Sequence, residues 1–179
     1  MRFSDIPQIT RSGTYEVDIP LLHLQRVISN YKEDFGLQMN PDFQRGNVWT
    51  EEQQIKYLEF YFKGGKTARV IYFNCPAFGC ETEHCDIPNM VLVDGLQRLT
   101  ALIRFLNNEI PIFGTYFKDF EDNPRDSLTM IKFNINDLQT KAEVLQWYLD
   151  MNTGGTVHSD EEIQRVNELL EKEKFKNDT

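Results

Sequence analysis

The stretch that decides the fold is Val91-Leu-Val-Asp-Gly-Leu-Gln-Arg-Leu-Thr-Ala-Leu102. A short apolar run stops at Asp94-Gly95, and apolar residues then recur at helical spacing. This pattern predicts a strand of residues 90–93 followed by a helix of residues 97–107. Arg98 falls in the first turn of that helix, where a cation opposes the helix macrodipole by roughly 0.3–1 kcal/mol. We therefore expect a negative partner for Arg98, either Asp94 or a bound anion.

The turn has two interpretations on the residues alone. In the first, Asp94 is the N-cap and Gln97 completes an Asp-x-x-Gln capping box, while Gly95 eases the turn. This interpretation leaves Arg98 unexplained, because Arg98 lies off the apolar face of the helix. In the second, backbone N–H groups and the guanidinium of Arg98 hold a phosphate at the helix N-terminus. The residues leave both interpretations open.

Two further polar loops carry similar chemistry. Asn40-Pro-Asp-Phe-Gln-Arg-Gly-Asn-Val-Trp49 pairs an amide, Gln44, with a guanidinium, Arg45, between aromatic anchors. It is either an ordinary ordered loop or part of a binding site. Met151-Asn-Thr-Gly-Gly-Thr156 predicts a turn, which is either an anion-binding nest of backbone N–H groups or a helix C-cap.

The rest of the chain predicts an α+β fold in one domain of residues 15–179, preceded by a flexible arm of residues 1–14. The predicted strands alternate or are rich in β-branched and aromatic residues, and they span 15–19, 69–74, 90–93, 110–113 and 129–133. The predicted helices begin at Pro20, after the Thr50-x-x-Gln53 capping box, at Gln97, at Thr140 and after the Ser159-x-x-Glu162 box.

Charge and composition limit the possible functions. The chain has 19 Lys and Arg against 28 Asp and Glu, a formal charge of −9. An acidic surface repels phosphate backbones, so we expect no bulk non-specific DNA binding, although a local basic pocket is compatible with this charge. No apolar run has the length of a signal peptide or a membrane span, which favours a cytoplasmic protein without membrane association.

The cysteines do not form a familiar metal motif. Cys75, Cys80 and Cys85 are an odd number, which argues against a disulfide framework. With His84 they offer four donors, but the spacing differs from that of structural zinc sites, so we expect no zinc.

The three loops in this order resemble the DGQQR-motif family of ParB/sulfiredoxin-like domains, which includes the GmrS half of the GmrSD modification-dependent restriction systems. The resemblance rests on Pro41–Trp49, Val93–Ala101 and Asn152–Gly155, and it covers about residues 15–170. The resemblance implies a short, freestanding member of the kind encoded by bacteriophages. Leu96 replaces the first glutamine of the motif and removes its polar contact, so the resemblance supports nucleotide binding more than hydrolysis.

The resemblance implies a ParB/sulfiredoxin-like mixed sheet with flanking helices that binds, and in some members hydrolyses, a nucleoside triphosphate in DNA restriction or phage–host conflict. Carried over by position, the catalytic residues are Asp94, Gln97 and Arg98, with Mg²⁺ held by Asp94. The residues implied in phosphate or nucleotide binding are Gln44, Arg45, Gly95, Arg98, Thr100, Asn152, Gly154 and Gly155.

Two alternatives from other functional classes remain open. One is a non-catalytic interaction module whose acidic surface docks on a basic partner, such as a nuclease subunit or a host DNA-binding protein; the net charge and Leu96 favour it. The other is a stand-alone ParB-like nuclease. The acidic balance and the lack of a clustered carboxylate and histidine metal motif make it the weakest of the three.

Overall fold

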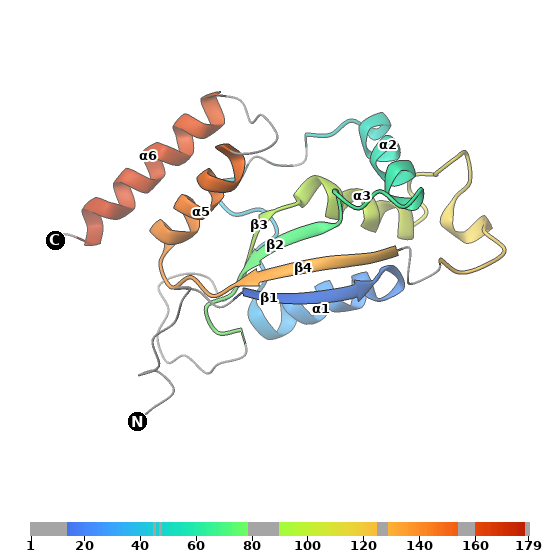
Figure 1. The fold of residues 1–179 in the computed structure, drawn as a ribbon, viewed down its shortest axis with the longest axis horizontal. Coiled ribbons are helices and arrows are strands. Elements are labelled where there is room, and N and C mark those ends of the chain that lie inside the picture. Colours follow the sequence, from blue (N-terminus) through green and yellow to red (C-terminus); the bar gives the residue numbers. More distant parts are fainter. Residues whose placement is uncertain are drawn as a thin grey trace.

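The computed structural model describes residues 14–44, 46, 48–78, 90–124, 129–153 and 160–177. These residues form an α+β fold in which a mixed sheet carries helices on both faces (Figure 1). The predicted fold class is confirmed, and the mixed sheet is consistent with a ParB-like fold. Residues 1–13 of the predicted arm lie outside the described residues, and residue 14 already belongs to the first strand.

The sheet has four strands in the order β1-β4-β2-β3. β1 pairs antiparallel with β4, β4 pairs parallel with β2, and β2 pairs antiparallel with β3. This order places β3 at one edge of the sheet, where its free side is available to other segments. The strand bounds are Thr14–Pro20 for β1, Val70–Asn74 for β2, Val91–Asp94 for β3 and Met130–Asn136 for β4.

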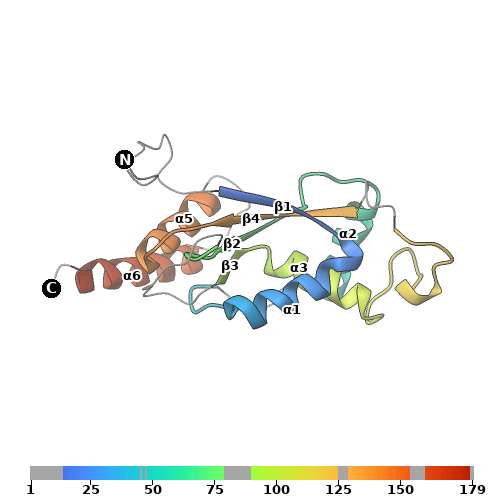
Figure 2. The same ribbon diagram turned by 90° about the horizontal axis from the view of Figure 1, so that it is seen from below.

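Two helical layers cover the sheet, with α1, α2 and α3 packed on one face and α5 and α6 on the other face at the β3 edge (Figure 2). The α-helices are α1 (Leu24–Phe35), α2 (Glu51–Phe62), α3 (Leu96–Leu106), α5 (Lys141–Thr153) and α6 (Asp160–Asn177). Two short 3-10 helices are η2 (Leu21–His23) and η3 (Phe117–Asp119).

β3 separates two hydrophobic cores. Leu92 faces the larger core, which α3 closes with Leu99, Leu102 and Phe105. Val91 and Val93 face the smaller core, which contains Val144, Leu145, Tyr148 and Val166 of α5 and α6. A strand that is buried on both faces needs apolar residues at every position, which explains the continuous run of residues 90–93.

The predicted strand of residues 110–113 is wrong. Ile112 forms only an isolated bridge to Thr115 across a tight turn, in which Phe113 and Gly114 have φ values of 47° and 78°. Ile110 and Ile112 are buried, so burial beneath a loop produced the apolar pattern that suggested a strand.

The predicted turn at Asn152 is also wrong in its first half. α5 continues through Thr153, so the backbone of Asn152 is helical. Gly154, Gly155 and Ser159 lie outside the described residues. Within the described parts of the chain, no helix has the length and hydrophobicity required to cross a bilayer.

Candidate functional site

The turn between β3 and α3 depends on Gly95, which is the N-cap of α3 and has a left-handed φ of 107°. A Cβ atom at this position would lie 2.7 Å from Cδ1 of Ile71 on β2. Glycine alone meets both restrictions, because it has no Cβ and adopts positive φ without strain. The tight turn allows the chain to pass from the end of β3 directly into α3.

The N-cap of α3 is Gly95, which has no side chain, so the capping-box interpretation of Asp94 and Gln97 is wrong. Asp94 is the last residue of β3, where it pairs with Tyr72, and one residue separates it from the helix. Since Gly95 takes the N-cap position, the carboxylate of Asp94 and the amide of Gln97 serve other contacts.

The carboxylate of Asp94 forms an ion pair with the guanidinium of Arg98, one helical turn later. Both side chains are partly shielded from solvent, so water screens this pair less than a fully exposed one. Of the two partners expected for the first-turn arginine, the structure provides Asp94. Arg98 also lies near Tyr57: burial raises the pKa of the Tyr57 phenol, and the charges of Arg98 and Arg69 oppose that rise.

Gln97 joins the loop before α2 to the start of α3 through hydrogen bonds. Its Oε1 accepts hydrogen bonds from the backbone N–H groups of Val48 and Trp49, both at 3.0 Å. Its Nε2 donates to the carbonyl of Gly46 at 3.1 Å. The amide is therefore engaged by the loop on both its donor and its acceptor side.

Gln44 fastens the same loop to the free edge of β3. Its side chain is only 9% exposed, and its Nε2 donates to the carbonyls of Leu92 and Val93 at 2.6 and 2.7 Å. Nearby, Gln38 forms a parallel bridge with Val91. The Gln44 loop and the Asp94–Arg98 turn, 50 residues apart in the sequence, are thus brought together.

α5 and α6 hold the loop from its other side. The Nζ of Lys141 lies 2.6 Å from Oδ2 of Asp42, and Nη2 of Arg165 donates to the carbonyl of Phe43 at 2.9 Å. The ring of Phe43 packs edge-on against Tyr148. Sequence reasoning missed these residues, since no local motif relates a loop to helices about a hundred residues away.

The remaining predicted site residues are only partly placed. Thr100 is half-buried in α3. Of Asn152, the backbone alone is described, and Arg45 lies outside the described residues with Gly154 and Gly155. Cys75 is buried, whereas Cys80, His84 and Cys85 lie outside the described residues.

The ligand atoms at the Asp94–Arg98 turn limit which metal ions the turn could bind. Among the described residues, no group of three or more histidine, cysteine, aspartate or glutamate side chains is arranged to hold a metal ion. Asp94 offers one carboxylate. That fits Mg²⁺ brought by a phosphate ligand, which keeps most of its water, rather than an ion held by protein ligands alone.

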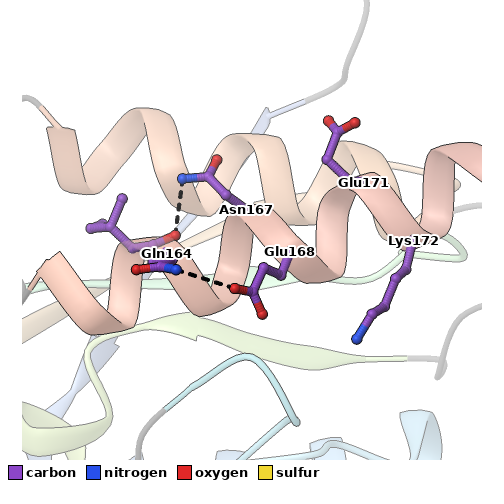
Figure 3. A pocket seen from close by; sticks show the side chains of 6 residues that line it. Gln164, Asn167, Glu168, Glu171 and Lys172 are labelled. Carbon is purple, nitrogen blue, oxygen red and sulfur yellow. Dashed lines mark hydrogen bonds between the residues drawn. The ribbon is translucent and has the colours of Figure 1, made fainter.

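A shallow hollow on α6 carries no comparable chemistry (Figure 3). Its polar side chains bond within the helix: Gln164 donates to Glu168 at 3.3 Å and Asn167 donates to the carbonyl of Ile163 at 3.0 Å. These are ordinary contacts of a solvated helix face, and all the described residues that line the hollow belong to α6.

Comparison with known proteins identifies one family. A model described as the N-terminal domain of GmrSD restriction endonuclease matches residues 24–126, more than half of the 179 residues. The matched range runs from the start of α1 past η3, so it contains both the Gln44 loop and the Asp94–Arg98 turn. Neither the curated proteins nor the solved structures include one that matches this chain.

Proposed function

This chain belongs to the family of GmrSD restriction endonuclease N-terminal domains, and we propose that it binds a nucleoside triphosphate at the Asp94–Arg98 turn. In this proposal the domain regulates a partner in DNA restriction or phage–host conflict. The family supports the link to restriction. The chemistry of the turn supports the nucleotide.

The observation that carries the proposal is the start of α3, where no side chain caps the helix and a guanidinium stands beside it. An uncapped helix N-terminus leaves backbone N–H groups without partners inside the helix, and it carries about half a positive charge. A phosphate satisfies these donors, and Arg98 adds a charge-assisted hydrogen bond.

The ion pair with Asp94 suits Arg98 to this role. Arginine has five N–H donors in a planar fork, and its bond to Asp94 uses Nη2. An arriving phosphate competes with Asp94 for the guanidinium, which frees the carboxylate. Mg²⁺ on the phosphates would neutralise their charge, and Asp94 is the residue that would hold it through water.

The residues at the turn support nucleotide binding more than nucleotide hydrolysis. Leu96, at the position of the first glutamine of the family motif, packs against the larger core and offers no polar atom. The loop engages the amide of Gln97 on both its donor and its acceptor side. Because Gln97 joins the loop to the turn, a bound phosphate also changes the environment of Gly46, Val48 and Trp49, which is a route to regulation.

Thermal unfolding with each of the four ribonucleoside triphosphates, with and without Mg²⁺, tests the proposal. A ligand at 100 times its Kd adds about 2.7 kcal/mol to the free energy of unfolding, which for this chain length raises Tm by roughly 5–11 °C. Arg98→Ala should abolish the shift. Arg26→Ala, at an exposed position of α1, is the matched control and should keep it.

Asp94→Asn sharpens the test because it removes the competitor of the phosphate and the proposed magnesium ligand together. We expect it to bind triphosphate more tightly than the wild type without Mg²⁺ and to lose the benefit of adding Mg²⁺. If no triphosphate raises Tm, or if Arg98→Ala keeps the full shift, the proposal is wrong. A phosphate-release measurement on the same samples separates binding from turnover.

A further inference from the structure

The aromatic surface is a group of exposed rings in the segment around η3, and this segment lies at the end of the molecule opposite α5 and α6 (Figures 1 and 2). It consists of Phe113, Tyr116 and Phe120, which lie within eight positions of the chain and are 53%, 38% and 40% exposed. Neighbouring exposed rings of this kind mark contact sites more often than isolated apolar residues do. Nothing in the proposed nucleotide site, which lies at the N-terminal end of α3, uses them.

Phe113 is held outward at a cost to the backbone. Its φ of 47° lies in the left-handed region, which bulky residues rarely adopt. α2 fixes it there: Oε1 of Glu59 accepts a hydrogen bond from its backbone N–H at 3.2 Å, and the Nζ of Lys63 lies 5.1 Å from its ring centroid. The left-handed backbone and the exposure of an apolar ring to water each lower the stability of the folded state. Two such costs at one residue point to a function for the ring.

A cavity of about 180 Å³ opens beside this surface. Sites for drug-sized molecules span roughly 300–1,000 Å³, so this cavity has the size for a single apolar side chain. Its walls are mostly apolar, and Asp122, Asn123 and Thr129 are the polar residues among them. The lining residues that matter here are Phe62, Phe105, Ile112, Phe117, Phe120 and Asp122.

The charges near the cavity indicate which residues flank the side chain that enters it. Asp119, Glu121 and Asp122 are exposed in this segment, and Asp122 lines the cavity. In the described part of the chain no ion pair involves these three carboxylates, and they outnumber the two lysines nearby, Lys118 and Lys63. A second copy of this chain carries the same charge of −9, so self-association through an acidic rim is disfavoured. The exposed carboxylates and the net charge of the chain both favour a basic partner.

We propose that the aromatic surface docks a basic protein segment, in which an apolar side chain flanked by lysine or arginine enters the cavity. The apolar side chain contacts Phe117 and Phe120, and the flanking cations face Asp122 and its acidic neighbours. Desolvated aromatic anchors supply most of the affinity in such interfaces, while rim charges contribute specificity and association rate. This surface is independent of the proposed nucleotide site.

A labelled peptide Lys-Lys-Phe-Lys-Lys is the probe, titrated against the full chain by fluorescence polarisation. Replacing its Phe by Ser, or its lysines by glutamates, should weaken binding at least fivefold. On the protein, Asp122→Asn should weaken binding roughly threefold at low salt, and the charge-matched Asp34→Asn, on exposed α1, should leave it unchanged.

Phe113→Asn separates binding from folding. Asparagine tolerates positive φ better than phenylalanine, so Tm should stay the same or rise while peptide binding falls at least fivefold. Val48→Asn, at an equally exposed position near the opposite end of α3, should bind the peptide as the wild type does. The proposal is overturned if the Ser or Glu peptide binds within twofold of the parent, or if Phe113→Asn and Val48→Asn bind equally.

Discussion

At the turn between β3 and α3, Gly95 combines a left-handed φ with a close approach to Ile71. Gly36, the C-cap of α1, has a left-handed φ of 60° but open space where a Cβ would stand. Gly36 therefore shows the effect of a left-handed φ alone, whereas Gly95 combines a left-handed φ with a lack of space for any Cβ atom. Only at Gly95 do both apply, because the turn must bring α3 against the sheet directly after β3.

Gly95→Ala should lower the free energy of unfolding by about 2–5 kcal/mol, since it adds the strain of positive φ to the overlap with Ile71. Gly36→Ala should cost only about 1–2 kcal/mol, because strain alone applies there. Urea unfolding of the two variants measures the difference. Equal losses would show that the approach to Ile71 is relieved by side-chain movement.

At the level of elements, the loop between α1 and α2 completes the edge of the sheet. Backbone bonds at Gln38 and the side chain of Gln44 attach it to β3, and Gln97 attaches it to α3. α2 then begins at a reciprocal capping box between Thr50 and Gln53, as predicted. The loop is therefore held by β3 and α3, besides α5 and α6, and Gln97 joins it to the proposed phosphate site.

Gln97→Ala should release the loop from α3 without unfolding the domain. It removes three hydrogen bonds at a partly exposed position, which should cost about 1–3 kcal/mol. The backbone N–H groups of Val48 and Trp49 should then exchange hydrogen faster than in the wild type. Gln146→Ala, which removes one surface bond to Asp150, is the control, and unchanged exchange at 48 and 49 would contradict this role for Gln97.

For the molecule as a whole, α2 links the larger core to the loops around it through two buried tyrosines. The hydroxyl of Tyr57 donates to the carbonyl of Ala68 at 3.0 Å, and the hydroxyl of Tyr61 donates to the carbonyl of Thr129 at 2.5 Å. Burial raises the pKa of both phenols well above the ordinary value of 10.0, and the charge of Arg69 opposes the rise in each.

Stability should therefore fall in alkaline solution. A folded pKa above the unfolded value means that the stabilisation is complete below about pH 10 and is lost as pH rises toward the folded pKa, because the unfolded chain releases its protons first. Urea unfolding between pH 8 and 11 measures this fall. The double variant Tyr57→Phe, Tyr61→Phe should flatten the profile, and exposed Tyr116→Phe should not. A profile that keeps its wild-type slope in the double variant would contradict the assignment.

The sequence predicted well wherever the structure depends on local pattern. The strand before Asp94, the helix after it and the capping box at Thr50 follow from periodicity and from hydrogen bonds between near neighbours. The predicted strand at Ile112 failed because an apolar residue under a loop has the same local pattern as one in a sheet. Periodicity reports burial, and burial does not require a hydrogen-bonded partner strand.

By itself the sequence determined the α+β class, the family resemblance and the small group of residues at Asp94–Arg98. It could not decide how those residues are used. Two roles were open to Gln97, helix capping and a place in the nucleotide site, and the tertiary structure gives it a third: its amide bonds Gly46, Val48 and Trp49 of the loop. Likewise the structure pairs Arg98 with Asp94, one of the two negative partners that the sequence left open. Partner choice among polar side chains depends on which donors and acceptors the packed elements bring within about 3 Å, and distance along the chain does not encode that.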